Sequence, residues 1–506
     1  MSSGTMTAQQ AVLRRQVMPA VLISLAAGLG LMVAAPHASA DAARMAGSPG
    51  PPAGAGSPVT AYVANYVSGT VTPIAAATNT PGPPITTGVD PAAIAITPDG
   101  KTVYVVNVGP GPGPSTVTPI ATATNTAGPP ITVGLQPLFI AITPDGKTVY
   151  VVNTNVNSGT GLGSVTPITT AANTPGPPIP VGSDPGAIAI TPDGKTAYVA
   201  NRGGNTVTPI DVATNTAGTP ILVGSAPRAI AITPDGKTAY VVNDGSETVT
   251  PITTATNTPG PSIPVEGQPH GIVITPDGKT AYVANVASDT VTPITTATNT
   301  AGPPIAVGID PEFIVITPDG KTVYVANGGS DTVTPITTAT NTAGPPIAVG
   351  SLPDAIAITP DGKTVYVANY VSGTVTPIVT ATNTPGPPIP VGTHPDAIAI
   401  TPATVTPAPA FTSGSAATAA YGARFSFTVT ATGSPAPTIT RTGRLPSGVR
   451  FTANGDGAAT ISGTPRRAAA GPYRLTLTAR NKNGTATQAF TLTVTRAPAI
   501  RKIPTP

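Results

Sequence analysis

The sequence predicts an all-β protein, and three observations support this fold class. Helix-favouring Glu, Lys, Leu and Met are sparse beside Thr, Val and Ile. The 506 residues include 55 Gly and 64 Pro, which favour turns, and only 9% are charged. One motif recurs with a nearly constant period, and a segment of alternating apolar and polar residues follows it. The absence of Cys excludes disulfides, thiolate metal sites and Cys nucleophiles.

The N-terminal segment has the pattern of an export signal. Arg14 and Arg15 form a short positive region, residues 20–35 are an apolar run, and small residues suit cleavage near Ala40. We therefore expect a secreted or cell-surface protein, with a flexible linker rich in Ala, Gly, Pro and Ser at 41–57. The alternative is a retained membrane anchor, although the run is short for a span of about 20 residues.

The middle of the chain consists of repeats. A Tyr opens a YVAN or YVVN motif eight times, with spacings of 42, 46, 48, 42, 42, 42 and 42 residues. A period of this length predicts a solenoid, a propeller or a linear array. The eight residues are Tyr62, Tyr104, Tyr150, Tyr198, Tyr240, Tyr282, Tyr324 and Tyr366.

Each repeat contains four short segments of strand character. In the unit 355–392 they are AIAIT, TVYVAN, GTVTPI and PPIPVG. The first two are joined by PDGK, and Asp-Gly between apolar runs is a strong hairpin signal. Four antiparallel strands at this period predict a propeller blade.

The repeats resemble the YVTN-type β-propeller repeat of bacterial and archaeal surface-layer and secreted proteins. The stretch ITPDGKTVYVAN at 316–327 carries the resemblance, which covers about two-thirds of the chain. The repeats depart from that pattern by a proline inside the third strand of every unit. Because proline cannot donate to a ladder, we expect a bulge there, or a short outermost strand. These prolines are Pro73, Pro119, Pro167, Pro209, Pro251, Pro293, Pro335 and Pro377.

The ends of the array predict how the propeller closes. The array begins at Tyr62 with a second strand that lacks a first, and it ends at 398–401 with a first strand that lacks a second. Joined, they make one composite blade, and seven complete units lie between them. We therefore expect an eight-bladed propeller over 58–402, closed by its terminal strands. The alternative is a seven-bladed ring with one loose unit.

Comparison of the repeats predicts where ligands bind. The PDGK and ATNT-type turns hardly vary, whereas the links between second and third strands, and those between blades, vary throughout. Loops on a rigid scaffold commonly carry binding sites, although neutral drift is an alternative. The candidate ligand-binding residues are Asp90, Asp184, Arg202, Arg228, Asp244, Glu247, His270, Asp289, Asp310, Glu312, Asp331, Asp354, His394 and Asp396.

The charge of the repeats is negative. Residues 58–402 hold nine Lys and Arg against nineteen Asp and Glu, a net charge of −10. A cationic partner or Ca²⁺ is the expectation from such a field; acids that only maintain solubility are the alternative. No EF-hand-type run is present, and we assign no metal site and no cofactor.

The sequence offers little support for catalysis. His270 and His394 lie in blade links three blades apart, and no clustered set of partners is evident. No catalytic residue is assigned. The enzyme alternative is a lactonase-like hydrolase or lyase with its site at the channel mouth. Nucleic acid is not expected as a partner.

A second domain follows a Pro-, Ala- and Thr-rich linker at 403–410. Residues 411–497 contain FSFTVTA, ATISG, YRLTLTA and AFTLTVT, which predict a β-sandwich, and a tail follows at 498–506. The elements LPSGV and ISGTP resemble a cadherin-like Ig domain of bacterial surface and secreted proteins. Its expected core is Phe425, Phe427, Phe451, Tyr473, Leu475, Leu477, Phe490 and Leu492.

The C-terminal region is strongly basic. Residues 403–506 hold ten Arg and two Lys against one acid, a net charge of +11. Attachment to an anionic cell-envelope polymer is one expectation, and arginine enrichment from a GC-rich genome is the alternative. The candidate envelope-binding residues are Arg444, Arg450, Arg466, Arg467, Arg480 and Lys482.

Together these features predict an exported, non-enzymatic binding or scaffold protein. The propeller would present its variable loops to a protein, glycan or cation, and the Ig-like domain would serve as a spacer or anchor. A self-assembling surface-layer subunit is a further alternative.

Overall fold

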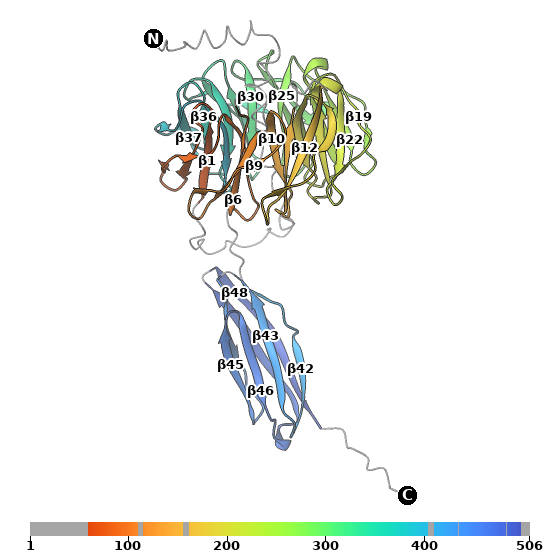
Figure 1. Cartoon of the computed structure of the whole chain (residues 1–506). Coiled ribbons are helices and arrows are strands. Elements are labelled where there is room, and N and C mark those ends of the chain that lie inside the picture. Colours follow the sequence, from red (N-terminus) through yellow and green to blue (C-terminus); the bar gives the residue numbers. More distant parts are fainter. Residues whose placement is uncertain are drawn as a thin grey trace. The chain divides into compact units, whose positions relative to one another are not determined.

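The computed structural model divides the chain into two compact units, a repeat domain and a C-terminal domain (Figure 1). The predicted signal peptide and linker lie outside the described residues. Within the described part, no helix is long and apolar enough to cross a bilayer. The structure describes residues 59–109, 115–154, 161–402, 409–433, 435–481 and 483–496.

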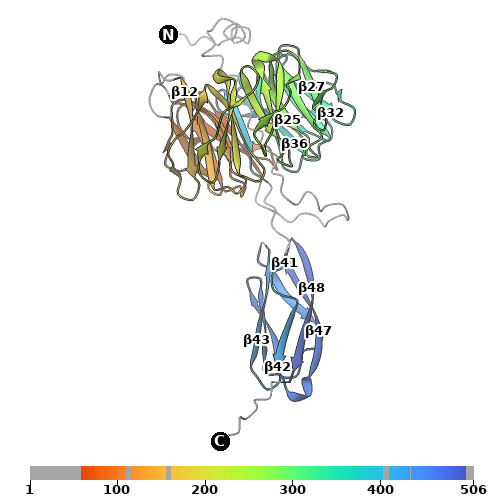
Figure 2. The ribbon, with the colours of Figure 1, turned by 90° about the vertical axis from the view of Figure 1, so that its right-hand side faces the viewer.

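The described part of the repeat domain builds eight sheets arranged as the blades of a propeller (Figures 1 and 2). The innermost strand of each sheet contacts that of the next, and β40 contacts both β35 and β5, so the ring is closed. The innermost strands are β5 (Pro91–Ile96), β10 (Pro137–Ile142), β15 (Pro185–Ile190), β20 (Pro227–Ile232), β25 (Pro269–Ile274), β30 (Pro311–Ile316), β35 (Pro353–Ile358) and β40 (Pro395–Ile400).

The second and third strands form regular antiparallel hairpins in every blade. The second strands are β1 (Thr60–Asn65), β6 (Thr102–Asn107), β11 (Thr148–Asn153), β16 (Thr196–Asn201), β21 (Thr238–Asn243), β26 (Thr280–Asn285), β31 (Thr322–Asn327) and β36 (Thr364–Asn369). The third strands are β2 (Thr70–Ala75), β7 (Thr116–Ala121), β12 (Leu162–Thr169), β17 (Thr206–Asp211), β22 (Thr248–Thr253), β27 (Thr290–Thr295), β32 (Thr332–Thr337) and β37 (Thr374–Val379).

The composite blade is present as expected. Strand β40, from the end of the array, pairs antiparallel with β1 from its beginning, and Ile398 lies opposite Val63. The eight-blade expectation is therefore confirmed, with one sheet built from both ends of the domain.

The proline in the third strand coincides with a break in the fourth. Pro119 lies opposite Tyr104 on its inner side, and on its outer side its carbonyl accepts a 2.7 Å hydrogen bond from the N–H of Gly128. The following Pro129 and Pro130 also lack an N–H, so the outermost strand bulges away and re-pairs only at Ile131. The sequence interpretation of these prolines is thus confirmed.

The outermost strands are accordingly pairs of short segments. They are β3 (Thr80–Pro81) and β4 (Ile85–Thr86), β8 (Thr126–Ala127) and β9 (Ile131–Thr132), β13 (Thr174–Pro175) and β14 (Ile179–Ser183), β18 (Thr216–Ala217) and β19 (Ile221–Leu222), β23 (Thr258–Pro259) and β24 (Ile263–Pro264), β28 (Thr300–Ala301) and β29 (Ile305–Ala306), β33 (Thr342–Ala343) and β34 (Ile347–Ala348), and β38 (Thr384–Pro385) and β39 (Ile389–Pro390).

Neighbouring blades are joined by apolar packing and by one repeated polar contact. One core cluster contains Tyr62 and Val71 of the composite blade with Ile94 and Val103 of the next. In each blade the tyrosine hydroxyl of the second strand donates to the side-chain oxygen of an Asn in the following blade. The pairs are Tyr62–Asn125, Tyr104–Asn173, Tyr150–Asn215, Tyr198–Asn257, Tyr240–Asn299, Tyr282–Asn341, Tyr324–Asn383 and Tyr366–Asn79.

The C-terminal domain is a β-sandwich of two four-stranded sheets. Of the predicted core, Leu475, Leu477, Phe490 and Leu492 are buried, and the other aromatic residues pack against them while partly buried. One sheet contains β41 (Ala410–Phe411), β43 (Phe425–Thr432), β46 (Ala458–Gly463) and β45 (Val449–Gly455); the other contains β42 (Ala416–Ala420), β48 (Gly484–Thr495), β47 (Gly471–Asn481) and β44 (Thr438–Thr442).

Candidate functional site

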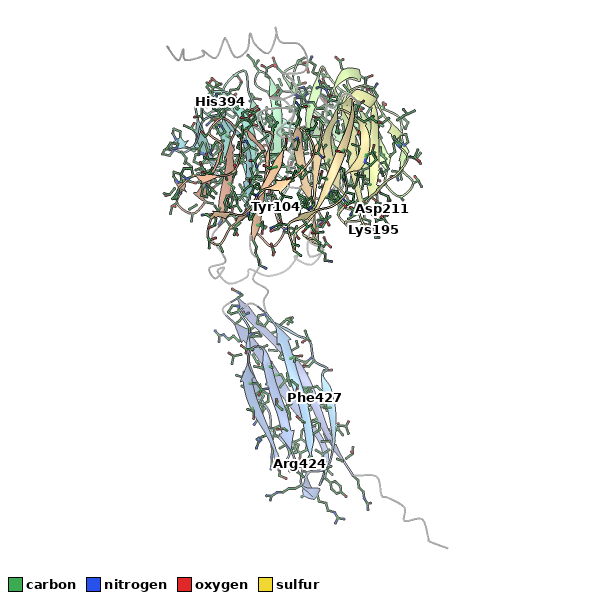
Figure 3. All side chains as sticks on the ribbon, viewed as in Figure 1. Tyr104, Lys195, Asp211, His394, Arg424 and Phe427 are labelled. Carbon is green, nitrogen blue, oxygen red and sulfur yellow. The ribbon has the colours of Figure 1, made fainter. Side chains whose placement is uncertain are left out.

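The two classes of loop lie on opposite faces of the propeller. The PDGK and ATNT-type turns touch each other; for example, the Thr122 hydroxyl donates to the carbonyl of Gly100 at 2.7 Å. Figure 3 shows Lys195 and Asp211 on this side, which we call the turn face. His394 lies on the opposite side, which we call the variable face, formed by the second-to-third links and the blade links.

The variable face is held together by the backbone. The residue that follows each second strand donates its N–H to a carbonyl in the blade link, as Tyr66 does to His394 at 2.8 Å and Arg202 does to Asp184 at 2.9 Å. The same bond occurs in every blade. A regular backbone frame therefore supports side chains that differ from blade to blade.

Every innermost strand begins with a β-bulge on this face. In β5, Pro91 lies opposite Asn107 and Ala93 lies opposite Val106, so Ala92 has no partner in the register. Such an extra residue has its side chain directed differently from those of a regular strand. We call the eight equivalent residues the bulge ring: Ala92, Leu138, Gly186, Arg228, His270, Glu312, Asp354 and Asp396.

The bulge ring has an apolar part and an ionisable part. The first three blades contribute Ala92, Leu138 and Gly186, whereas the next five contribute only ionisable side chains. These side chains are largely buried: Asp354 and Asp396 are each 1% exposed and Glu312 is 6% exposed.

His270 and Glu312 form a buried pair between neighbouring blades. Nδ1 of His270 lies 3.6 Å from Oε1 of Glu312, and the two side chains are 12% and 6% exposed. Burial lowers the pKa of His270, and the positive charge of Arg228 lowers it further. Glu312 opposes both effects. The imidazole is therefore expected to be neutral near neutral pH.

Asp354 on β35 and Asp396 on β40 form a second pair, at the boundary between the last complete blade and the composite blade. Burial raises the pKa of Asp396 well above its usual value, and interaction with the neighbouring Asp354 carboxyl raises it further. Ionisation of both carboxyl groups together is therefore disfavoured.

On the other side of His270, two guanidinium groups meet one carboxylate. Arg202 and Arg228 lie 3.8 and 3.9 Å from the same oxygen, Oδ2 of Asp244. The Arg228 side chain is only 10% exposed, which is unusual for a charged residue.

A small hollow lies next to this group, where Gly186 interrupts the bulge ring between Leu138 and Arg228. It is formed by three successive blades and combines an apolar wall with charged groups. Its lining residues are Leu138, Phe139, Thr154, Asp184, Pro185, Gly186, Arg202 and Arg228.

Several predicted site residues have structural partners. Oδ1 of Asp289 accepts a 3.1 Å bond from the N–H of Asp310, and Oδ1 of Asp331 accepts a 2.8 Å bond from the N–H of Leu352. The ring of His394 stacks on Tyr370 with centroids 4.3 Å apart, and burial lowers the His394 pKa. These groups fix the loops of the variable face.

The remaining predicted residues are spread around the rim. Asp90, Asp184 and Asp310 occupy the equivalent left-handed position of three blade links, and burial raises the pKa of Asp90. Glu247 is exposed at the end of η2 (Asp244–Ser246). The structure thus brings Arg202 and Arg228 together with Asp184 and Asp244. It also pairs His270 with Glu312 and Asp354 with Asp396.

Sequence reasoning missed the apolar members of the site. Leu138, Phe139 and Gly186 carry no charge and were not chosen among the variable-loop residues. Alignment of the repeats on the invariant proline that starts each innermost strand would have found Leu138 and Gly186, because the next residue differs in almost every blade.

The basic candidates of the C-terminal domain are on its surface. Arg444, Arg450, Arg466, Arg467 and Arg480 are exposed, with Arg450 on β45, Arg480 on β47 and Arg467 in η3 (Arg467–Ala469). Lys482 lies outside the described residues. Within the described parts of both domains, no group of three or more His, Asp or Glu is placed to hold a metal ion.

Comparison with known proteins agrees with the two domains. The family described as "Lactonase, 7-bladed beta-propeller" matches residues 156–260, and the family described as "Putative Ig domain" matches residues 403–495. The first family is described as seven-bladed, whereas the described part of this chain builds eight sheets. No curated protein sequence is significantly similar to the chain.

Solved structures with the same fold are distant in sequence. The dihydro-heme d1 dehydrogenase NirN is 15% identical with a TM-score of 0.58, over 67% of this chain and 74% of its own. AztD from Citrobacter koseri is 13% identical with a TM-score of 0.52, over 68% and 97%. The chain is therefore a β-propeller repeat protein with a C-terminal Ig-like domain.

Proposed function

We propose that this chain is an exported, cell-surface or secreted binding protein. The propeller presents its variable face to a protein, glycan or cation ligand, and the Ig-like domain is a spacer or an anchor to the cell envelope. The observation that carries the proposal is the concentration of buried ionisable residues in the bulge ring of five successive blades.

Burial makes neutral drift a poor account of this pattern. An ionisable side chain that is removed from water costs stability unless it is paired. Positions that drift in a buried environment should collect apolar residues, as the neighbouring strand positions do. In the same blades, the tyrosine and asparagine positions are unchanged, and PDGK is unchanged in the four blades that contain it. These residues pair with one another, Arg228 with Asp244 and His270 with Glu312, and we infer that a binding role of this face maintains them.

The anchor role rests on charge. The C-terminal region carries a net charge of +11, and five of its candidate arginines are exposed. A basic surface of this kind attracts anionic envelope polymers, and the attraction weakens with salt.

The test is binding of the mature protein to its producer's isolated cell envelope across a salt series, with residues 58–402 and 403–506 also tested separately. We expect the C-terminal part alone to bind and salt to release it. If neither part binds, the anchor role is wrong. If only the propeller binds, its variable face becomes the attachment surface.

A second candidate function is hydrolysis at the bulge ring. Neutral His270 beside Glu312 is suited to act as a general base, and Arg228 is suited to stabilise a developing negative charge. The match of residues 156–260 to a lactonase family favours this candidate. Its test is a lactone panel with His270→Asn and Glu312→Gln variants: hydrolysis that both variants abolish would support it, and an inactive parent protein would exclude it for those substrates.

A further inference from the structure

We propose that seven exposed threonines in the outermost strands of the propeller are acceptors for O-linked sugars. This inference goes beyond the proposed function, because these residues lie on the outer edges of the blades and not on the variable face. We call them the outer-strand threonines: Thr80, Thr126, Thr174, Thr258, Thr300, Thr342 and Thr384.

The outer-strand threonines begin strands that have a free edge. Thr258 begins β23 and lies opposite Thr253 of β22, and β23 pairs with no other strand in the described part of the chain. All seven threonines are exposed, and so are the residues three and four positions later, which are Pro-Pro in six of the seven blades. Proline holds its own φ near about −65° and keeps the preceding residue extended. Each threonine is therefore presented on an extended, accessible segment.

Neighbouring residues of the same turn have structural partners. Oδ1 of Asn257 accepts a hydrogen bond from the Tyr198 hydroxyl at 2.6 Å. The Thr254 hydroxyl donates to the carbonyl of Gly236, also at 2.6 Å. Contacts within the propeller therefore account for these two side chains.

No comparable contact accounts for the outer-strand threonines. Among the described residues, Oγ1 of Thr258 has one hydrogen-bond partner, the carbonyl of Thr256 at 3.4 Å, and the corresponding distance is 3.3–3.4 Å in all seven blades. A firm O–H···O hydrogen bond is about 2.5–3.0 Å long. Strand propensity favours Val and Ile as well as Thr, yet each of these blades has a hydroxyl at this position. The hydroxyl is thus repeated, exposed and only weakly bonded.

The equivalent Thr216 is excluded because its hydroxyl is engaged. The Thr214 hydroxyl donates to Oδ1 of Asp211 at 2.7 Å, and the hydroxyls of Thr216 and Thr214 are themselves 2.7 Å apart. Thr216 is also followed by Thr219-Pro220 in place of Pro-Pro. The chain therefore contains its own contrast to the seven proposed acceptors.

The chemistry of O-glycosylation requires an accessible hydroxyl. The threonine oxygen bonds to the anomeric carbon of a sugar carried on a phosphate, the bond between that carbon and the phosphate breaks, and the hydroxyl proton passes to a base of the transferase. No group is oxidised or reduced. Segments rich in Ser or Thr with Pro have the composition typical of O-glycosylated chains. The outer-strand threonines meet both the chemical and the compositional requirement.

The experiment is intact mass spectrometry of the mature full-length protein purified from its producer. The control is the same chain made in a host without protein glycosylation. We expect the producer's protein to be heavier by the mass of a whole number of sugar residues. Equal masses would overturn the proposal.

Peptide analysis then locates the sugar. The tryptic peptide 238–279 contains Thr250, Thr254 and Thr258. We expect sugar on Thr258 and none on Thr254, whose hydroxyl is engaged. We also expect none on Thr250, which is 3% exposed and accepts a 2.9 Å hydrogen bond from Asn243. Sugar confined to residues other than the outer-strand threonines would contradict the assignment.

Variants made in the producer test the acceptor residue. Thr258→Val keeps the shape and strand propensity of the side chain but removes the hydroxyl, so the peptide 238–279 should lose its sugar while peptides from the other blades keep theirs. Thr254→Val is the matched control, because Val212 occupies the same position in another blade, and it should leave the sugar in place. Sugar that persists on this peptide in Thr258→Val would refute Thr258 as the acceptor.

The outcome is separable from the proposed function. If the producer's protein carries no sugar but binds the isolated cell envelope, only the acceptor assignment is wrong. If Thr258 carries sugar but envelope binding is absent, the acceptor assignment stands and the anchor role is wrong.

Discussion

The hydroxyl of Tyr366 donates a hydrogen bond to the side-chain oxygen of Asn79, although the two residues are 287 positions apart in sequence. Asn79 follows β2 and has a left-handed backbone conformation with φ of 54°, and Tyr366 lies on β36. This is the last of the eight equivalent bonds and the one that crosses from the final complete blade to the composite blade. It links side chains across the junction that closes the ring.

Loss of this hydrogen bond should weaken the contact between the final complete blade and the composite blade. We expect Tyr366→Phe to lower the free energy of unfolding by about 1 kcal/mol, because the Asn79 amide loses its buried partner. The matched variant Tyr240→Phe, which loses the same bond to Asn299 within the ring, should cost about the same. Chemical denaturation measures both.

Hydrogen exchange separates the two variants. Only Tyr366→Phe should speed exchange in β1 and β2, because these strands are held to the rest of the domain by non-covalent contacts at the junction. Equal protection of β1 and β2 in both variants would show that the backbone ladder between β40 and β1 suffices for closure.

The carboxyl pair in the bulge ring should make stability depend on pH. The Asp396 pKa is raised in the folded state, so the folded protein binds more protons than the unfolded chain above the usual value of 3.8. This contribution to stability is fully present below that value and is lost as the pH rises through the folded pKa.

Asp396→Asn removes the cost of ionising the pair. We expect it to stabilise the protein by about 1–3 kcal/mol at about pH 8, and much less near pH 4, where the parent carboxyl is already protonated. Denaturant unfolding at the two pH values measures the difference. A loss of stability at both pH values would mean that ionisation of the pair is not the main cost at this position.

Much of the fold could be predicted because the same local rules repeat in every blade. The Asp-Gly turns, the tyrosine spacing and the unmatched strands at Tyr62 and Ile398 together determine blade and ring. The third-strand prolines predicted a disturbed outer strand for a physical reason, a missing N–H, that does not depend on tertiary context.

The candidate site could be predicted only in part, because charge counting cannot distinguish exposed acids from acids with structural roles. Asp289 and Asp331 accept backbone N–H bonds, and Asp354 and Asp396 are buried beside each other. The β-bulge that places the ring residues lies in the pairing of the first and second strands of each blade, and the residues alone do not reveal this register. Alignment of the repeats marks position 186 as variable, but it does not show that Gly186 lies beside Arg202 and Arg228.

On the turn face, the Asp of each PDGK turn should contribute to the free energy of unfolding, whereas the Lys should contribute little. Oδ1 of Asp145 accepts bonds from the Thr143 hydroxyl at 2.7 Å and the Lys147 N–H at 3.1 Å, and the Thr143 bond is the main cause of its lowered pKa. The Lys147 Nζ–Oδ2 contact of 3.1 Å is between side chains that are 81% and 54% exposed.

We therefore expect Asp145→Ala to cost about 1 kcal/mol of unfolding free energy and Lys147→Gln less than about 0.5 kcal/mol. Because the pKa of Asp145 is lowered in the folded state, its contribution is present above the unfolded value and is lost as the pH falls. The Asp145→Ala penalty should shrink in acid. A larger penalty for Lys147→Gln, reduced by salt, would instead assign the stability to the ion pair.

Two glycines of the innermost strands should respond oppositely to the same substitution. Gly186→Ala should be neutral or stabilise the protein by up to about 1 kcal/mol, because the new methyl group meets only ordinary contacts and the unfolded chain loses freedom. Gly271→Ala should cost about 1–3 kcal/mol, because its Cβ would lie 2.6 Å from a backbone oxygen. Thermal or denaturant unfolding of the two variants tests this contrast directly. If Gly186→Ala were as damaging as Gly271→Ala, close packing and not an open space would explain the glycine at position 186.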